Sequence, residues 1–172
     1  MAQNSTEIER KWLIEDSPEV AKRRRAKIVQ GYLAISQKGN EVRLRRKDER
    51  FFQTVKSGSG LKRSEVEVEI SRKQFKKLWP MTRGRRLEKV RYALKWEGTK
   101  IEFDIYRKKL SGLKVAEVEF KSTEEAESFS PPDWFGREVT RDPQYKNSTL
   151  ASRKMKQTTK PQPPKQQLNS AK

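Results

Sequence analysis

The stretch EIERKWLI, residues 7–14, decides the fold of this chain. With a period of two, its charged residues fall on one side of an extended strand and its apolar residues fall on the other. The charged side carries Glu7, Glu9 and Lys11. A strand in a soluble protein usually turns its apolar side to the core and its charged side to water. Taken alone, the stretch therefore predicts an ordinary half-buried strand.

The same alternation returns in almost every later extended segment, and both signs of charge recur on the polar side. The acidic residues of these charged sides are Glu7, Glu9, Glu65, Glu67, Glu69, Glu102, Asp104, Glu117 and Glu119. The basic ones are Lys11, Arg43, Arg45, Lys56, Arg63, Lys89 and Arg91. About eight such strands with hairpin-scale connections predict an antiparallel sheet or barrel.

Two arrangements of this barrel fit the alternation. In one, the apolar sides fill the centre and the charges face solvent. In the other, the charges line a central cavity and helices cover the apolar sides from outside. Because breaking a buried ion pair typically costs ~3–5 kcal/mol, a two-signed interior is sensible only if it is wet or holds an ionic ligand. A polyanion on the basic groups and divalent cations on the carboxylates would be such a ligand set.

Short helices are expected between the strands. Ser71 can cap one that precedes Pro80, and Ser122 or Thr123 can cap another over 124–129. A helix near 18–25 and a last helix from about 147 to 155 complete the prediction. Gly31 is expected to break the second strand.

Composition excludes several kinds of site. The chain of 172 residues carries a formal net charge of +18, which favours polyanionic partners such as nucleic acid, an anionic membrane surface or phosphorylated small molecules. It has no Cys and no His, so disulfides, zinc–thiolate sites, thiol nucleophiles and imidazole bases are excluded. Any metal must be bound by oxygen ligands, which suits Mg²⁺ and Mn²⁺.

The ends of the sequence give further expectations. No apolar run is long enough to span a bilayer and the N-terminus lacks a signal-peptide core, so we predict a cytoplasmic protein without a membrane partner. Residues 1–155 are predicted to form one domain. Residues 156–172 are rich in Gln, Lys and Pro, and are predicted to be disordered because they have too little apolar surface to offset chain entropy.

These residues also resemble a known family, the triphosphate tunnel metalloenzymes of the CYTH superfamily. The motifs that carry the resemblance follow in order over roughly residues 5–152. They are ExExK at 7–11, GYL at 31–33, VRLR at 42–45, TVK at 54–56, RxExExE at 63–69, KxRY at 89–92, FD at 103–104, AEVE at 116–119, and EVTxD with YxNxxL at 138–150. The first motif alone would be weak, but the whole series in register is specific.

The resemblance implies a fold and a site. It implies a mainly β protein, an eight-stranded antiparallel β-barrel tunnel with a charged interior, flanked by short helices, that binds triphosphate and Mg²⁺ or Mn²⁺. Short bacterial members of this kind are similar to inorganic triphosphatases. The residues implied to bind substrate are Lys11, Tyr32, Arg43, Arg45, Lys56, Lys89 and Arg91. Those implied to bind metal are Glu7, Glu9, Glu67, Glu69, Asp104, Glu117 and Glu119.

The predicted chemistry is metal-dependent hydrolysis of inorganic triphosphate to pyrophosphate and phosphate. One ion would neutralise the phosphates, and a second would activate the water that attacks the terminal phosphorus in line. Lys11 and Glu9 are the predicted catalytic residues. Lys11, crowded by cations, is expected to have a lowered pKa and to position or deprotonate the water, unless the metal alone suffices. For Tyr32, substrate contact and aromatic packing fit equally well.

Other functions stay open at this point. An organic triphosphate, such as a nucleoside or thiamine triphosphate, is one alternative substrate, and cyclisation of a nucleotide is another reaction. A basic nucleic-acid-binding or polyphosphate-binding module without turnover explains the net charge, but not the alternating acids, which would repel phosphate without metal. Nucleic acid is therefore disfavoured as a partner. The sequence allows a homodimer without requiring one.

Overall fold

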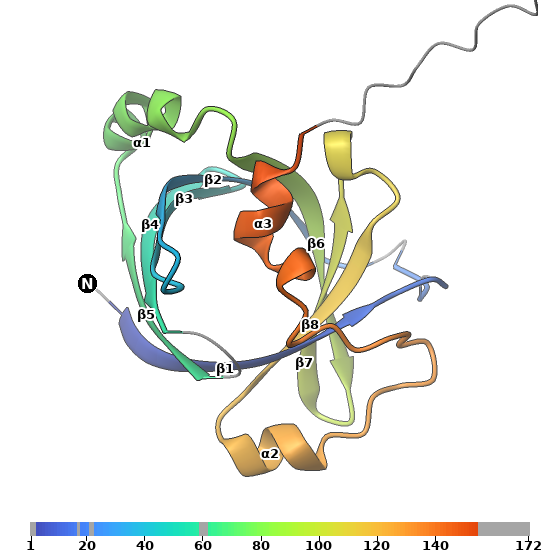
Figure 1. Cartoon of the computed structure of the whole chain (residues 1–172). Coiled ribbons are helices and arrows are strands. Elements are labelled where there is room, and N and C mark those ends of the chain that lie inside the picture. Colours follow the sequence, from blue (N-terminus) through green and yellow to red (C-terminus); the bar gives the residue numbers. More distant parts are fainter. Residues whose placement is uncertain (1–2, 17, 21–22, 59–61, 155–172) are drawn as a thin grey trace, which may run out of the picture.

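The computed structural model describes residues 3–16, 18–20, 23–58 and 62–154. Its strands close into one antiparallel barrel in the order β1-β5-β4-β3-β2-β6-β7-β8 (Figure 1). The strands are β1 (Gln3–Leu13), β2 (Arg25–Ile35), β3 (Glu41–Lys47), β4 (Arg50–Ser57), β5 (Lys62–Glu69), β6 (Arg86–Trp96), β7 (Thr99–Tyr106) and β8 (Lys114–Phe120). The predicted eight-stranded antiparallel barrel is confirmed.

Short helices connect or follow the strands. The α-helices are α1 (Arg72–Leu78), α2 (Thr123–Ser128) and α3 (Asn147–Ser152), and the 3₁₀ helices are η1 (Trp79–Thr82), η2 (Lys108–Leu110) and η3 (Pro143–Tyr145). In Figure 1, α1 and α2 lie outside the barrel, whereas α3 lies across its opening. Helices α1 and α2 therefore cover the outside of the barrel, and α3 covers one of its openings.

The charged sides of the strands point into the barrel, and the apolar sides point out. On the outside of β3 and β4, Leu44 and Phe51 pack against Phe75 of α1. Around β1, β7 and β8, the outward residues form a larger cluster that includes Trp12 and Phe103 and that α2 and the segment after it cover. Of the two arrangements that the alternation allowed, the structure has the one with a charged interior.

An apolar cluster of inward-facing strand residues and α3 closes one end of the barrel. Tyr32, Leu87, Tyr106 and Val115 end the inward rows of β2, β6, β7 and β8, and they form an apolar cluster with Leu150 and Ala151 of α3. All six of these side chains are buried. The charged lumen therefore has an apolar floor beneath α3 and leads toward the opposite mouth.

Most of the predicted helices are present. Ser71 caps α1 with a full capping box, and Ser122 caps α2. The helix expected near 18–25 is wrong, because the described residues 18–20, 23 and 24 lie outside helices and strands and β2 already begins at Arg25. The last helix begins where expected but ends at Ser152.

Gly31 does not break β2, which continues past it with a register shift between Tyr32 and Ala34. A Cβ atom at position 31 would lie 2.6 Å from Oγ1 of Thr82. The glycine therefore lets η1 approach the outside of the strand.

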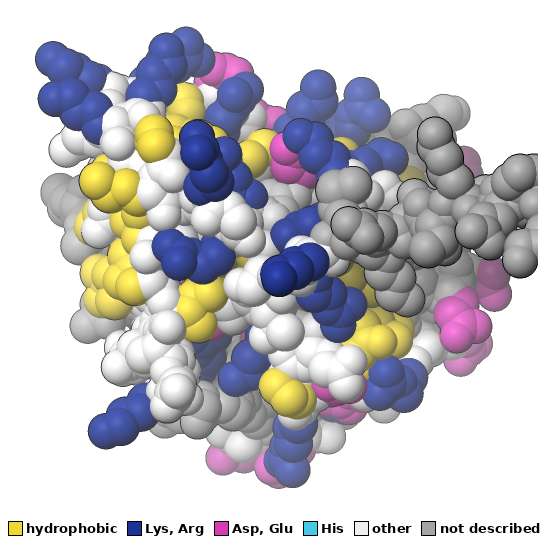
Figure 2. All heavy atoms as spheres, turned by 45° about the horizontal axis from the view of Figure 1, so that its top comes forward, with side chains coloured by type: hydrophobic (Ala, Val, Ile, Leu, Met, Phe, Trp, Pro, Cys, Tyr) yellow, Lys and Arg dark blue, Asp and Glu magenta, His cyan; other side chains and the backbone are white. Residues whose placement is uncertain are grey.

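The outer surface is strongly basic. Lys and Arg side chains predominate on the face that Figure 2 shows, in keeping with the net charge of +18. Within the part of the chain that the structure describes, no helix is long and apolar enough to cross a membrane. The predicted disordered segment 156–172 lies outside the described residues.

Candidate active site

The lumen encloses a cavity of about 430 Å³. Its walls differ in the charge that predominates, with Lys11, Arg63 and Lys100 as cations on the mainly acidic strands and Glu41 as an acid on a mainly basic one. The strands β4, β3, β2 and β6 lie side by side and form what we call the cationic wall, which carries Lys56, Arg43, Arg45, Lys47, Lys89 and Arg91. The strands β7, β8, β1 and β5 form the acidic wall, which carries Glu102, Asp104, Glu117, Glu119, Glu7, Glu9, Glu65 and Glu67.

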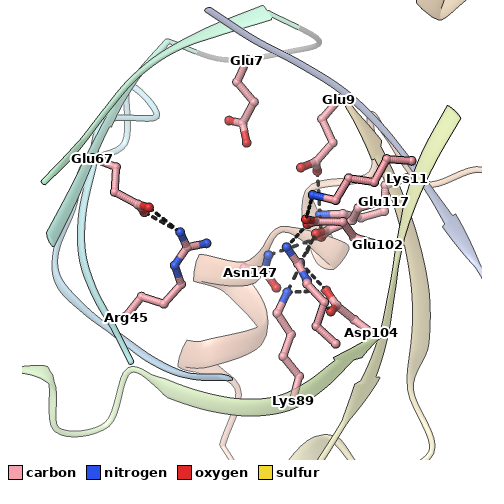
Figure 3. Close-up of polar contacts among 12 residues, drawn as sticks. Glu7, Glu9, Lys11, Arg45, Glu67, Lys89, Glu102, Asp104, Glu117 and Asn147 are labelled. Carbon is pink, nitrogen blue, oxygen red and sulfur yellow. Dashed lines mark hydrogen bonds and ion pairs between the residues drawn. The ribbon is translucent and has the colours of Figure 1, made fainter. Parts of the chain in front are cut away.

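The two walls meet at the seam between β6 and β7, where a buried ion cluster forms (Figure 3). Arg91 donates from Nη2 to Asp104 and to Glu117, at 2.6 Å in each case, and also pairs with Glu102. The Lys89 ammonium lies 2.5 Å from Asp104, which is fully buried. Burial and the neighbouring Arg91 together lower the pKa of Lys89. The seam is thus held by charges that neutralise one another inside the barrel.

A second set of ion pairs lies between β4 and β5, at the other junction of the walls. The Lys56 ammonium lies 2.5 Å from Glu7 and 2.6 Å from Glu65. Glu67 accepts from Arg45 at 2.6 Å and from the Thr54 hydroxyl at 2.8 Å. Figure 3 shows the Arg45–Glu67 pair on the side of the lumen opposite the seam cluster. Carboxylates and cations from both walls therefore surround the same cavity.

Three guanidinium groups keep an unused donor. The Nε atoms of Arg43, Arg45 and Arg63 are buried and have no hydrogen-bond partner among the described residues. A buried donor without an acceptor costs roughly 1–3 kcal/mol, which an anionic ligand in the cavity would recover. These donors indicate that the cationic wall is built for an anion with several oxygen atoms.

The neighbours of Lys11, and the direction in which they shift its pKa, differ from the prediction. Its ammonium lies 2.9 Å from Glu117 and 3.4 Å from Glu9, so its neighbours are carboxylates rather than cations. Burial alone would lower the pKa of Lys11, but Glu117 and Glu9 raise it well above its ordinary value. The expectation of a lowered pKa is wrong. These two carboxylates favour the protonated form of Lys11 on the acidic wall.

The carboxylates of the acidic wall do not all titrate alike. Burial raises the pKa of Glu9, and the nearby Glu117 raises it further. Partial burial and the charges of Glu7 and Glu65 raise the pKa of Glu119. For Glu117, burial acts in the same direction, but Lys11 and the cations of the seam hold its pKa well below the usual range. Glu9 and Glu119 are thus carboxylates whose pKa values are raised first by burial and then by neighbouring acids.

This acidic wall fits a divalent cation only in part. Among the described residues, no three carboxylates lie close enough together to hold a metal ion by themselves. A hard cation beside Glu9 and Glu119 would relieve the repulsion that raises their pKa values, and it is bound by oxygen ligands. The remaining ligands would have to be water and oxygen atoms of an anion on the cationic wall.

Most of the predicted site residues line this cavity or pair with residues that do. Those that line it are Glu7, Glu9, Lys11, Tyr32, Arg43, Arg45, Lys56, Lys89, Arg91, Glu117 and Glu119. Glu67 and Asp104 pair with Arg45 and Arg91. Glu69 lies apart from the set, since its exposed carboxylate pairs with Arg50 outside the cavity lining. Tyr32 packs in the apolar floor and also lines the cavity.

Other lining residues had no predicted role. Glu41 pairs with Arg63 at 3.3 Å and accepts from the Ser148 hydroxyl of α3. Asn147 accepts from the Tyr106 hydroxyl at 2.6 Å. Lys47 and Lys100 extend the inward rows of β3 and β7, and the period-two pattern of those strands already contains them.

Comparison with known proteins places this fold in a family. Residues 5–153 match the CYTH domain. A relative from Nitrosomonas europaea named inorganic triphosphatase is 46% identical over 147 residues, which cover 85% of this chain and 97% of the relative. A second, from Acetivibrio thermocellus and of the same name, is 34% identical and covers 84% of this chain and 92% of its own.

Solved structures agree with the barrel. A crystal structure of an inorganic triphosphatase is 42% identical, covers 86% of this chain and 95% of its own, and superposes with a TM-score of 0.66. A structure from Bacillus halodurans, named as a candidate adenylate cyclase, has a TM-score of 0.53 at 17% identity, with coverage of 72% of this chain and 85% of its own. At that identity the likeness concerns the fold alone.

Proposed function

This chain belongs to the CYTH domain family, and we propose that it is a metal-dependent triphosphatase that hydrolyses inorganic triphosphate to pyrophosphate and phosphate. The observation that carries the proposal is the unused Nε donors of Arg43 and Arg45, buried on the wall of a cavity that also offers carboxylates with raised pKa values. Such a cavity suits an anion of several charges together with a divalent cation. The relatives named inorganic triphosphatase support the choice of substrate.

The cationic wall would bind the substrate. Arg43, Arg45 and Arg91 present planar donor groups that can hold two phosphate oxygens each, whereas Lys56 and Lys89 act as point charges. Each of these cations except Arg43 has a carboxylate within 2.6 Å, so the triphosphate must exchange places with some of these partners. Before the substrate binds, these carboxylate partners keep the cations ordered.

The acidic wall would hold Mg²⁺ or Mn²⁺, chiefly through Glu9 and Glu119, with Glu7, Glu67, Asp104 and Glu117 near by. When bound, such an ion neutralises phosphate charge and makes a water molecule more acidic. Glu69 is too far out for this set, because its carboxylate is engaged with Arg50 at 2.8 Å. The proposed metal ligands therefore come from the inner part of the wall.

In the reaction, the oxygen of a water molecule forms a bond to a terminal phosphorus while the bond from that phosphorus to its bridging oxygen breaks. Pyrophosphate leaves with the electron pair of that bond. Glu9 would act by holding the ion that makes this water more acidic, and the proton of the water would pass to solvent in the cavity. Lys11 would stay protonated between Glu9 and Glu117, and would stabilise the negative charge that develops on the phosphate oxygens.

The test is release of phosphate from tripolyphosphate, ATP and pyrophosphate with Mg²⁺, with Mn²⁺ and with a chelator. We expect metal-dependent release that favours tripolyphosphate and falls by about 1,000-fold in Glu9→Gln, a loss typical of a removed catalytic group. Glu19→Gln, an exposed change away from the lumen, is the matched control. A preference for ATP would point to a nucleotide substrate, and no turnover with any metal would refute the proposal. The cytoplasmic location and a homodimer stay predictions from the sequence.

A further inference from the structure

Two lysines line the outer end of the cavity and have no role in the function proposed above: Lys47 on the cationic wall and Lys100 on β7 of the acidic wall. On β3 the inward row runs from Arg43 through Arg45 to Lys47, a distance of ~13 Å at ~3.3 Å per residue. On β7 the inward row runs from Asp104 through Glu102 to Lys100. Both rows start at the apolar floor under α3 and end at the opposite mouth, so Lys47 and Lys100 lie at the outer end of the cavity that they line.

Their contacts leave both lysines available. Lys47 is exposed, and its ammonium makes no hydrogen bond or ion pair with any described residue. The Lys100 ammonium lies 2.6 Å from one oxygen of Glu102, whose other oxygen pairs with Arg91 of the seam cluster. Lys100 is therefore linked to the deeper cations through a single shared carboxylate, while its side chain remains 64% exposed.

Cations predominate around these two lysines, although Glu102 pairs with Lys100. Burial, Arg45 and Arg91 lower the pKa of Lys47. Burial, Arg91 and Lys47 itself lower the pKa of Lys100. Since like charges repel across the mouth, an anion between the two lysines would stabilise both of them.

Building on the function proposed above, we propose that Lys47 and Lys100 bind the outer terminal phosphate of the substrate and thereby select inorganic triphosphate against nucleoside triphosphates. An inorganic triphosphate ends in two unsubstituted phosphates, each with up to two negative charges. In a nucleoside triphosphate, the phosphate at one end is esterified, so it has one charge fewer and carries a bulky group.

The shape of the lumen sets the direction of binding. The apolar floor and α3 cover the inner end, so the outer end of any bound chain points to the mouth. There the ligand meets the ammonium groups of Lys47 and Lys100. A free terminal phosphate is favoured at this position, whereas a nucleoside must displace the interaction with Lys47 and Lys100.

Calorimetric titration with tripolyphosphate and with ATP, both in the presence of a chelator, tests this inference without turnover. The variant Lys47→Ala/Lys100→Ala should bind tripolyphosphate about 10-fold more weakly, while the affinity for ATP should change by less than about 2-fold. Removing two exposed charges should not unfold the barrel. The matched control is Lys73→Ala/Lys76→Ala on the exposed side of α1, which changes net charge equally outside the lumen.

An equal loss of affinity for both ligands, or a loss as large in the control variant, would overturn the inference, because the lysines would then act only through general charge. Unchanged binding of tripolyphosphate would overturn it as well. Phosphate release by the wild type is measured separately. A protein that binds tripolyphosphate with the expected selectivity but never hydrolyses it would refute the proposed function and leave this inference in place.

Discussion

The cationic wall and the acidic wall of the lumen have the same period-two strand pattern, but their charged side chains differ in how they are compensated. On the cationic wall, Arg43 and Arg45 keep buried donors without partners, so this wall lacks acceptors. On the acidic wall, burial and neighbouring carboxylates raise the pKa values of Glu9 and Glu119, so a further cation beside them would stabilise their charged forms. Each wall is short of the charge that a bound metal–triphosphate complex would bring to it. The difference teaches that the site is completed by its ligands rather than by the protein.

The largest effect is expected where the walls meet. Replacing Asp104 by Asn leaves the buried Lys89 with Glu117 alone, at 3.9 Å, and removes part of the charge that balances Arg91. Breaking a buried pair costs roughly 3–5 kcal/mol. Urea unfolding should show this as a lower free energy of unfolding. The exposed Asp133→Asn serves as control and should change it little. An unchanged midpoint in Asp104→Asn would mean that the seam is not what joins the walls.

The next variant weakens the cationic wall alone. Arg45→Gln removes a planar donor group, so tripolyphosphate measured with a chelator should bind ~10–100-fold more weakly. The affinity for Mn²⁺ should not fall, since Glu67 loses its partner and gains freedom to bind a cation. Arg46→Gln changes the next residue, which is exposed and pairs with Glu49 outside the lumen, and should leave both affinities intact. Parallel losses of both ligands in Arg45→Gln would contradict a division between the walls.

The converse variant weakens the acidic wall alone. Glu119→Gln should lower the affinity for Mn²⁺ by about 10-fold or more, a size typical of disturbed metal sites. Tripolyphosphate with a chelator should bind as in the wild type or more tightly, because one repelling charge is gone. Titration calorimetry measures both, with the exposed Glu15→Gln as control. If Mn²⁺ binds normally to Glu119→Gln, this carboxylate is not part of the metal site.

The smallest effect is one of pH. The pKa of Glu9 in the folded protein is higher than the ordinary 4.5. At a pH above this folded pKa, the carboxylate is charged and can bind metal. At a lower pH, the carboxylate is protonated and the metal is displaced. Its raised pKa also means that the charged form costs stability at neutral pH, so protonation of Glu9 itself does not unfold the barrel. The affinity for Mn²⁺ should therefore be half lost at a pH above 4.5, with circular dichroism unchanged. Loss only below 4.5 would argue against the raised pKa.

The sequence predicted the barrel because its two-residue period is uninterrupted in most strands, and the capping residues Ser71 and Ser122 marked two helices correctly. It left open which side of the strands faces inward until the family resemblance was considered. In the structure the apolar sides face outward, where Phe75 of α1 packs on β3 and β4, and α2 with the segment after it covers Trp12. The alternation within the strands does not predict these covering segments.

Long-range contacts account for what the sequence missed. Glu41 meets Ser148 of α3 although 107 positions separate them, and no local pattern announces that pair. The pKa of Lys11 shifts in the opposite direction to the prediction because Glu117, on a neighbouring strand, lies 2.9 Å from its ammonium. The helix expected near 18–25 follows local capping preference, which the pairing of Arg25 with Tyr92 overrides.

The most direct test of the division between the walls is the position of Mn²⁺ in crystals grown with Mn²⁺ and tripolyphosphate, found from its anomalous scattering. The account predicts a Mn²⁺ peak against the acidic wall beside Glu9 and Glu119, with phosphate density against Arg43, Arg45 and Arg91 across the lumen. A metal peak outside the barrel, or phosphate held without contact to the cationic wall, would contradict it.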